Sequence, residues 1–158
     1  MAQFDCSNII WHDIKEFKCL DRKVEYWIND SESLTRKIKN NFKNFNLKVL
    51  KFEKSEIYNH EKDKLSLEVE HIVREVIIYG DSKPIVFARS VIPDSQVFSN
   101  LVRIGEKPLG EVLFNDQEIT RTLIEVTFHN NIWGRRSIFT KNNNPLLVSE
   151  FFLDEIYA

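Results

Sequence analysis

Apolar residues recur at helical spacing in two early segments of the chain. Residues 21–29 carry Val24, Trp27 and Ile28 three or four positions apart, a spacing typical of an amphipathic helix. The range 31–45 carries a longer stripe at the same spacing, formed by Leu34, Ile38, Phe42 and Phe45. Ser31 is suited to cap the start of this second helix. Because each helix presents one apolar face, we expect both to lie on an apolar surface elsewhere in the fold.

Beyond residue 46 the pattern becomes that of strands. We predict six strands, at residues 47–56, 69–79, 85–92, 119–129, 136–140 and 145–153. A charged turn or short helix is expected at 60–67, and an irregular region at 93–116 with a helical turn ending at Phe114. Residues 80–84 predict a hairpin with a loop slightly longer than two residues, and the asparagines at 142–144 tolerate the positive φ of a tight turn. Consecutive hairpins indicate an α+β fold, an antiparallel sheet of about six strands with helices packed on one face.

Each of three predicted strands carries one charged residue in a row of apolar ones. Arg74 alternates with Ile72, Val76 and Ile78; Arg89 alternates with Ile85, Phe87 and Val91; Glu150 alternates with Leu146, Val148 and Phe152. Burying an unpaired charge is costly, so such residues are either paired or line a polar cavity. Two interpretations remain open. The three residues form structural ion pairs or face solvent, or they line a pocket for a small anion that bears a second polar group.

Composition narrows the classes of function. The chain has 158 residues with no repeat or linker, so we expect a single domain spanning residues 1–158. The formal net charge of −2 provides no positive field to hold nucleic acid or an anionic membrane. Cys6 and Cys19 are expected to be free thiols in a reducing compartment, and no apolar run is long enough to span a bilayer, which together predict a cytoplasmic protein.

Motifs of common catalytic sites are absent from the sequence. The four histidines are scattered, and there is neither a glycine-rich phosphate loop nor a nucleophile elbow nor a Cys-x-x-Cys pair. Residues 133–136 (Trp-Gly-Arg-Arg) are compatible with a nucleic-acid contact. In a net-acidic chain, however, a paired structural role or a ligand-binding role is favoured for these arginines.

Several segments in the second half of the chain together resemble bacterial chorismate lyase. The segments are 73–75 (Val-Arg-Glu), 88–93 (Ala-Arg-Ser-Val-Ile-Pro), 104–110 (Ile-Gly-Glu-Lys-Pro-Leu-Gly), 113–114 (Leu-Phe), 132–137 (Ile-Trp-Gly-Arg-Arg-Ser) and 145–153 (Pro-Leu-Leu-Val-Ser-Glu-Phe-Phe-Leu). Their order and spacing agree with the family over roughly half of the chain. Trp27 and residues 33–35 are similar to the family's early helix.

The resemblance implies a lyase that splits chorismate into 4-hydroxybenzoate and pyruvate, the step that opens ubiquinone synthesis. It implies a closed internal site with no metal and no organic cofactor. The family's ligand contacts fall on Arg74, Glu150, Leu109 and Leu34. In the family the arginine holds the ring carboxylate, and the glutamate holds the hydroxyl at the opposite side of the ring. Arg74 and Glu150 are also two of the three residues that strand alternation placed in apolar rows.

Two site positions depart from the family pattern. Leu34 replaces a methionine of similar volume, and Ala88 replaces a glycine that the family often has beside the arginine at position 89. Arg89 is expected either to bind the enolpyruvyl carboxylate or to form an ion pair that steadies the site. We expect a monomer whose partners are the small-molecule substrate and products. A non-catalytic effector-binding domain of related fold is the alternative function.

Overall fold

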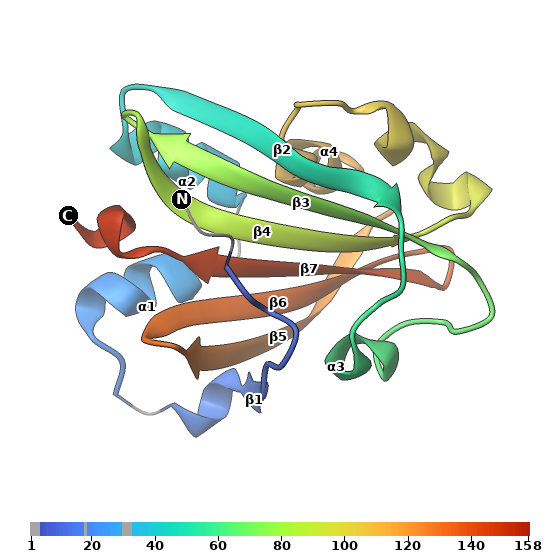
Figure 1. Cartoon of the computed structure of the whole chain (residues 1–158), viewed down its shortest axis with the longest axis horizontal. Coiled ribbons are helices and arrows are strands. Elements are labelled where there is room, and N and C mark those ends of the chain that lie inside the picture. The colour runs from blue at the N-terminus through green and yellow to red at the C-terminus, as the bar shows by residue number, and fades with distance from the viewer. Residues whose placement is uncertain (1–3, 18, 30–32) are drawn as a thin grey trace.

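The protein is built on one antiparallel sheet. The computed structural model describes residues 4–17, 19–29 and 33–158, and its seven strands follow the order β1-β5-β6-β7-β4-β3-β2 (Figure 1). Their bounds are β1 His12–Asp13, β2 Phe45–Lys54, β3 His71–Gly80, β4 Lys83–Pro93, β5 Thr120–His129, β6 Ile132–Lys141 and β7 Asn144–Phe152. The predicted α+β class and antiparallel sheet are confirmed, and the six predicted strands correspond to β2–β7. The two-residue β1, which pairs only with β5, is too short to leave a pattern in the sequence.

Three tight hairpin turns set the register of the central strands. Each turn consists of two residues with positive φ: Asp81 and Ser82, Asn130 and Asn131, and Asn142 and Asn143. Positive φ at both positions is what a two-residue turn between twisted strands requires, and Asn and Asp adopt it more readily than most residues. The turn asparagines after β6 were predicted. The loop after β3 is shorter than predicted, because Lys83 and Pro84 already pair with β3.

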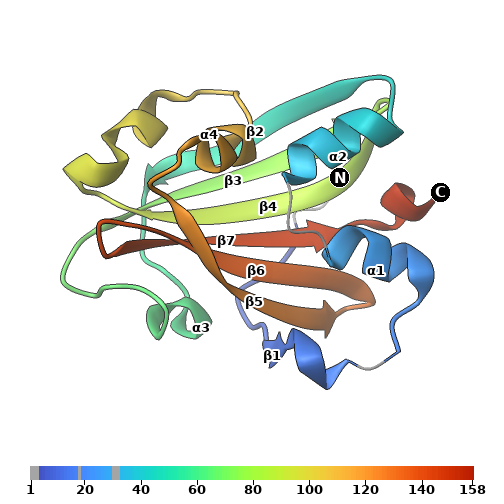
Figure 2. The same cartoon turned by 180° about the vertical axis from the view of Figure 1, so that it is seen from behind.

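In the part of the chain that the structure describes, three α-helices cover one face of the sheet. Figure 2 shows α1 (Arg22–Ile28), α2 (Leu34–Asn41) and α4 (Leu109–Asn115) in front of the strands. The second helix was predicted to run to Phe45, but it ends at Asn41, and Phe45 instead opens β2 by pairing with Gly80. Residue 45 therefore becomes part of a strand because it pairs with β3, although the spacing of apolar residues predicted a helix there. The predicted cap Ser31 lies outside the described residues; the hydroxyl of Ser33 accepts the Arg36 N–H at 3.4 Å.

The other face of the sheet is also covered. The N-terminal segment packs Cys6 and Ile9 onto Ile77, Phe87 and Phe151. The connection between β2 and β3, which includes the short α3 (Asn59–Lys62), packs onto the same face (Figure 1). The central strands are consequently buried on both faces.

Short 3-10 segments complete the fold. They are η1 Ile14–Glu16, η2 Gln96–Arg103 and η3 Asp154–Tyr157. In the described part of the chain, no helix has the length and apolar character that crossing a membrane would need.

Candidate active site

A cavity lies between the sheet and the helical cover. Its floor is made by β3, β4 and β7, and the first residues of α2 and α4, Leu34 and Leu109, form the opposite wall. The predicted site residues Arg74, Ala88 and Glu150 line the floor. The structure therefore brings together five of the six residues that the sequence singled out.

Arg74 is a buried cation without a carboxylate partner among the described residues. Its side chain is 2% exposed, and its Nη2 donates hydrogen bonds to the carbonyl oxygens of Gly105 (3.2 Å) and Lys107 (2.8 Å). Its Nε finds no hydrogen-bond acceptor in the described part of the chain. Burial lowers the pKa of the Arg74 guanidinium to about 10, because the charged form loses hydration that no carboxylate of the described residues replaces. A carboxylate ligand would supply both the missing charge and a missing acceptor.

Glu150 is oriented by a second arginine. On the sheet it pairs with Ala88 on one side and with Arg135 on the other. Arg135 Nε donates to Glu150 Oε1 at 2.9 Å, while Arg135 Nη1 donates to the carbonyl oxygens of Trp27 and Ile28. Those carbonyls belong to the last turn of α1, where the negative end of the helix dipole favours a cation. The carboxylate therefore enters the cavity with its position fixed by α1 through Arg135.

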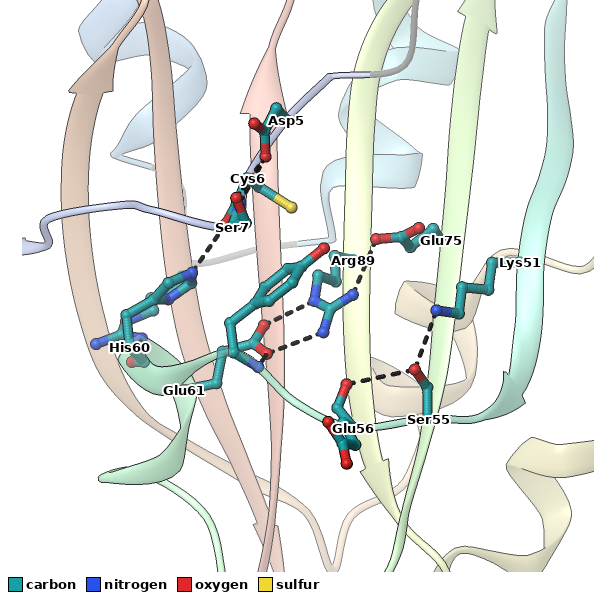
Figure 3. Close-up of polar contacts among 12 residues, drawn as sticks. Asp5, Cys6, Ser7, Lys51, Ser55, Glu56, His60, Glu61, Glu75 and Arg89 are labelled. Atoms are coloured by element: carbon teal, nitrogen blue, oxygen red, sulfur yellow. Dashed lines mark hydrogen bonds and ion pairs between the residues drawn. The ribbon is translucent and has the colours of Figure 1, made fainter.

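Arg89 lies on the opposite face of the sheet. Its Nε and Nη2 donate to the two carboxylate oxygens of Glu61 at 2.8 and 2.9 Å, and its Nη1 donates to Glu75 at 2.9 Å (Figure 3). Burial alone would lower the pKa of Arg89, but the hydrogen bonds and charges of the two glutamates outweigh burial and raise it. Consecutive residues of a strand point to opposite faces, so it is Ala88 and not Arg89 that borders the cavity. The prediction that Arg89 contacts a ligand is therefore wrong for this cavity. The alternative prediction, an ion pair, fits its position.

The two arginines after Gly134 point to opposite faces. Arg135 borders the cavity, whereas Arg136 donates to Glu125 Oε1 at 2.8 Å and to the carbonyl of His60 on the other face. Both are almost fully buried, at 1% and 3% exposed, and both form ion pairs, the first of the two roles that the sequence analysis preferred to a nucleic-acid contact.

Sequence reasoning missed Arg121, which also lines the cavity. Its strand, β5, contains a register shift between Arg121 and Leu123, and simple alternation cannot follow a strand through such a bulge. Within the described ranges, no group of three His, Cys, Asp or Glu side chains lies close enough together to hold a metal ion.

A solved structure shares the fold. The C-terminal domain of the histidine utilization repressor from Pseudomonas syringae pv. tomato superposes with a TM-score of 0.52 over 69% of this chain and 90% of that domain. The two sequences are 8% identical, so the likeness concerns the fold alone.

Sequence relatives extend over almost the whole chain. It is 36% identical to the probable chorismate pyruvate-lyase of Psychromonas ingrahamii, with 93% of this chain and 91% of the relative covered. It is 29% identical to the chorismate pyruvate-lyase of Pectobacterium atrosepticum, with 86% of this chain and 80% of the relative covered. The sequence model of the family described as chorismate lyase matches residues 5–158. This chain therefore belongs to the chorismate lyase family.

Proposed function

We propose that this chain eliminates pyruvate from chorismate to give 4-hydroxybenzoate, and that the reaction takes place in the cavity between the sheet, α2 and α4. The family and its relatives named chorismate pyruvate-lyase support the activity. One observation carries the choice of site. The fully buried Arg74 has an unused Nε and no carboxylate partner among the described residues, in a cavity that also contains Glu150.

The reaction mainly requires the protein to bind chorismate in the right orientation. Chorismate is a dianionic cyclohexadiene with a hydroxyl and an enolpyruvyl ether on adjacent ring carbons. Cleavage of the ring carbon–ether oxygen bond and loss of the hydrogen on the hydroxyl-bearing carbon make the ring aromatic, and the methylene carbon of the departing enolpyruvate gains a proton. Aromatisation supplies the driving force, so the reaction needs no strong nucleophile. We propose that it proceeds without a metal or organic cofactor, by holding the substrate in a reactive geometry.

Arg74 and Glu150 would grip the ring at opposite ends. A guanidinium matches the fork of a carboxylate, and in this site the ring carboxylate would offset the desolvation that depresses the pKa of Arg74. Glu150, held by Arg135, would accept a hydrogen bond from the ring hydroxyl and would take part in any proton transfer at that carbon. Both a stepwise acid–base elimination and a concerted hydrogen transfer use this arrangement.

The apolar wall would exclude water from the ring. Leu34 and Leu109 are 4% and 5% exposed and face the strand floor from α2 and α4. Lys39 of α2 and Glu111 of α4 form an ion pair of 2.8 Å that joins the two helices at the surface. We propose that these helices form the cover that must open for product release.

The proposed reaction also suggests a pathway, an oligomeric state and a cellular location for the protein. We propose that the product enters ubiquinone synthesis and that the chain acts as a single-domain monomer in the cytoplasm. The match of the family over residues 5–158 supports one domain, and the free Cys6 and Cys19 are in keeping with a reducing compartment. A non-catalytic effector domain is not favoured, because the relatives are named as lyases while the repressor domain shares only the fold.

Purified protein incubated with chorismate tests the activity directly. We expect 4-hydroxybenzoate, measured by absorbance, and pyruvate, measured by a coupled dehydrogenase, to appear in equal amounts and faster than in protein-free buffer. Glu150→Gln tests the site, with Glu155→Gln as the matched control, since Glu155 carries the same charge on the exposed η3. Absence of turnover by a folded wild-type protein would refute the function, and equal activity of the two variants would refute the site.

A further inference from the structure

The cavity is bordered by a further cation whose role the proposed function leaves open. Arg121 enters it from β5, on the far side of the floor from Arg74. The buried Ser137 holds it in place, since Arg121 Nε donates to Ser137 Oγ at 2.8 Å. Its guanidinium carbon lies 5.9 and 5.8 Å from the ring centres of Phe114 and Phe139.

The sheet register places Arg74 and the anchor of Arg121 in one row. Arg74 pairs with Ser90, Ser90 with Val148, and Val148 with Ser137, so this row crosses β3, β4, β7 and β6. Three strand spacings separate its ends, about 14 Å. Glu150 projects from the neighbouring row, two residues along β7 from Val148. Two guanidiniums therefore face the cavity from opposite sides, with the glutamate beside the space between them.

The positions of two arginines at opposite sides of the cavity match a ligand with two separate carboxylates. The described lining of the cavity places Arg74 at the β3 side and Arg121 at the β5 side, with the Arg135–Glu150 ion pair between them. Chorismate has two carboxylates, one on the ring and one on the enolpyruvyl group, whereas 4-hydroxybenzoate has only the first.

We propose that Arg121 binds the enolpyruvyl carboxylate of chorismate. This inference rests on the proposed function and assigns the second carboxylate of the same substrate. Arg74 would bind the ring carboxylate and Arg121 the carboxylate of the enolpyruvyl group. The ether bond that breaks lies between these two bound groups, which orients it for elimination. Arg121 thereby favours the dianionic substrate over the aromatic product, because only the substrate reaches both cations.

The test compares substrate and product affinity in the same variants. Arg121→Gln removes the charge but keeps a side chain able to bond Ser137, and Arg121→Lys keeps the charge without the forked geometry. Arg103→Gln, which removes the same charge from the exposed η2, is the control for long-range electrostatics. The chorismate KM and the 4-hydroxybenzoate inhibition constant are measured for each protein.

We expect Arg121→Gln to raise the chorismate KM about 10- to 100-fold, as for a lost charge-assisted contact, and to change the 4-hydroxybenzoate inhibition constant by less than about twofold. Arg121→Lys should give an intermediate KM, and Arg103→Gln should resemble wild type. An unchanged KM in Arg121→Gln, or equal weakening of substrate and product, would overturn the inference. Turnover of chorismate by the wild-type protein is measured in the same experiment. If the wild type is active, such a result refutes only the role of Arg121; the proposed function is refuted only if the wild type itself is inactive toward chorismate.

Discussion

Replacement of Arg74 tests the anchor of the site. Arg74→Gln keeps much of the side-chain volume and a donor for the carbonyls of Gly105 and Lys107, but it removes the only cation on the β3 side of the cavity floor among the described residues. A carboxylate entering the variant would lose its hydration without gaining an opposite charge. We therefore expect Arg74→Gln to weaken binding of both chorismate and 4-hydroxybenzoate.

The magnitude follows from burial. Arg74 is 2% exposed, so its contact with a carboxylate would be largely free of solvent screening. Removing one partner of a buried, hydrogen-bonded charge pair costs about 2–5 kcal/mol. At about 1.4 kcal/mol per tenfold change, this corresponds to a loss of roughly 30- to several thousand-fold in affinity.

A pair of ligands separates charge recognition from loop support. Arg74 also ties down the segment around Gly105 and Lys107, just before the cavity residue Leu109, so the variant can weaken binding by loosening that wall. Titration calorimetry with 4-hydroxybenzoate and with its uncharged analogue 4-hydroxybenzamide resolves the two effects. Charge recognition predicts that wild type prefers the carboxylate and that Arg74→Gln loses this preference.

Two outcomes would refute the reasoning about Arg74. If Arg74→Gln weakens both ligands by the same factor, the arginine supports the loop and the carboxylate binds elsewhere. If neither affinity changes, Arg74 does not face the ligand at all. Thermal unfolding of each protein shows whether a loss of binding merely reflects a loss of fold.

Further predictions concern catalysis, product release and pH. Glu150→Gln should lower kcat about 100- to 10,000-fold if Glu150 moves a proton, but only modestly if it orients the hydroxyl, and full activity in steady-state assays would exclude both roles. Ala88→Gly should tighten 4-hydroxybenzoate binding and deepen product inhibition with little change in kcat, since Ala88 lines the cavity floor; equal or weaker inhibition would mean that its methyl does not touch the product. Burial lowers the pKa of His71, whose Nε2 has no partner among the described residues, so below pH of about 6.5 the unfolded chain takes up a proton that the folded chain resists. Denaturant unfolding should therefore show wild-type stability falling as pH drops from about 6.5 to 5, with a flatter profile in His71→Gln, and parallel profiles would contradict this origin.

The sequence alone determined the strand framework and two of the candidate site residues. Alternation over Arg74 and Glu150 identified charges within apolar rows, because a period of two is a local property of any strand. The asparagine turn after β6 could also be predicted from the sequence, because asparagine itself adopts positive φ more readily than most residues. The family resemblance added Leu34, Leu109 and Ala88, which strand alternation had not singled out.

The tertiary structure decided which face of the sheet holds the candidate site. Because β3, β4 and β7 are buried on both faces, alternation cannot tell a cavity from a core. Arg74 and Arg89 looked equivalent in the sequence, but Glu61, brought in from α3, neutralises Arg89 on the far face. That contact joins residues 28 positions apart and follows no local pattern.

Arg121 shows the same limit most clearly. Counting by twos along β5 assigns it to the face of Glu125, whose partner is Arg136 on the far side of the sheet. The bulge between Arg121 and Leu123 shifts the register, so that Arg121 pairs with Phe139 and turns toward the cavity. A bulge arises from how two strands fit together, which depends on both strands and on the layers packed against them. For this reason the pairing of β5 with β6, and not the sequence of β5, brings the third arginine into the site.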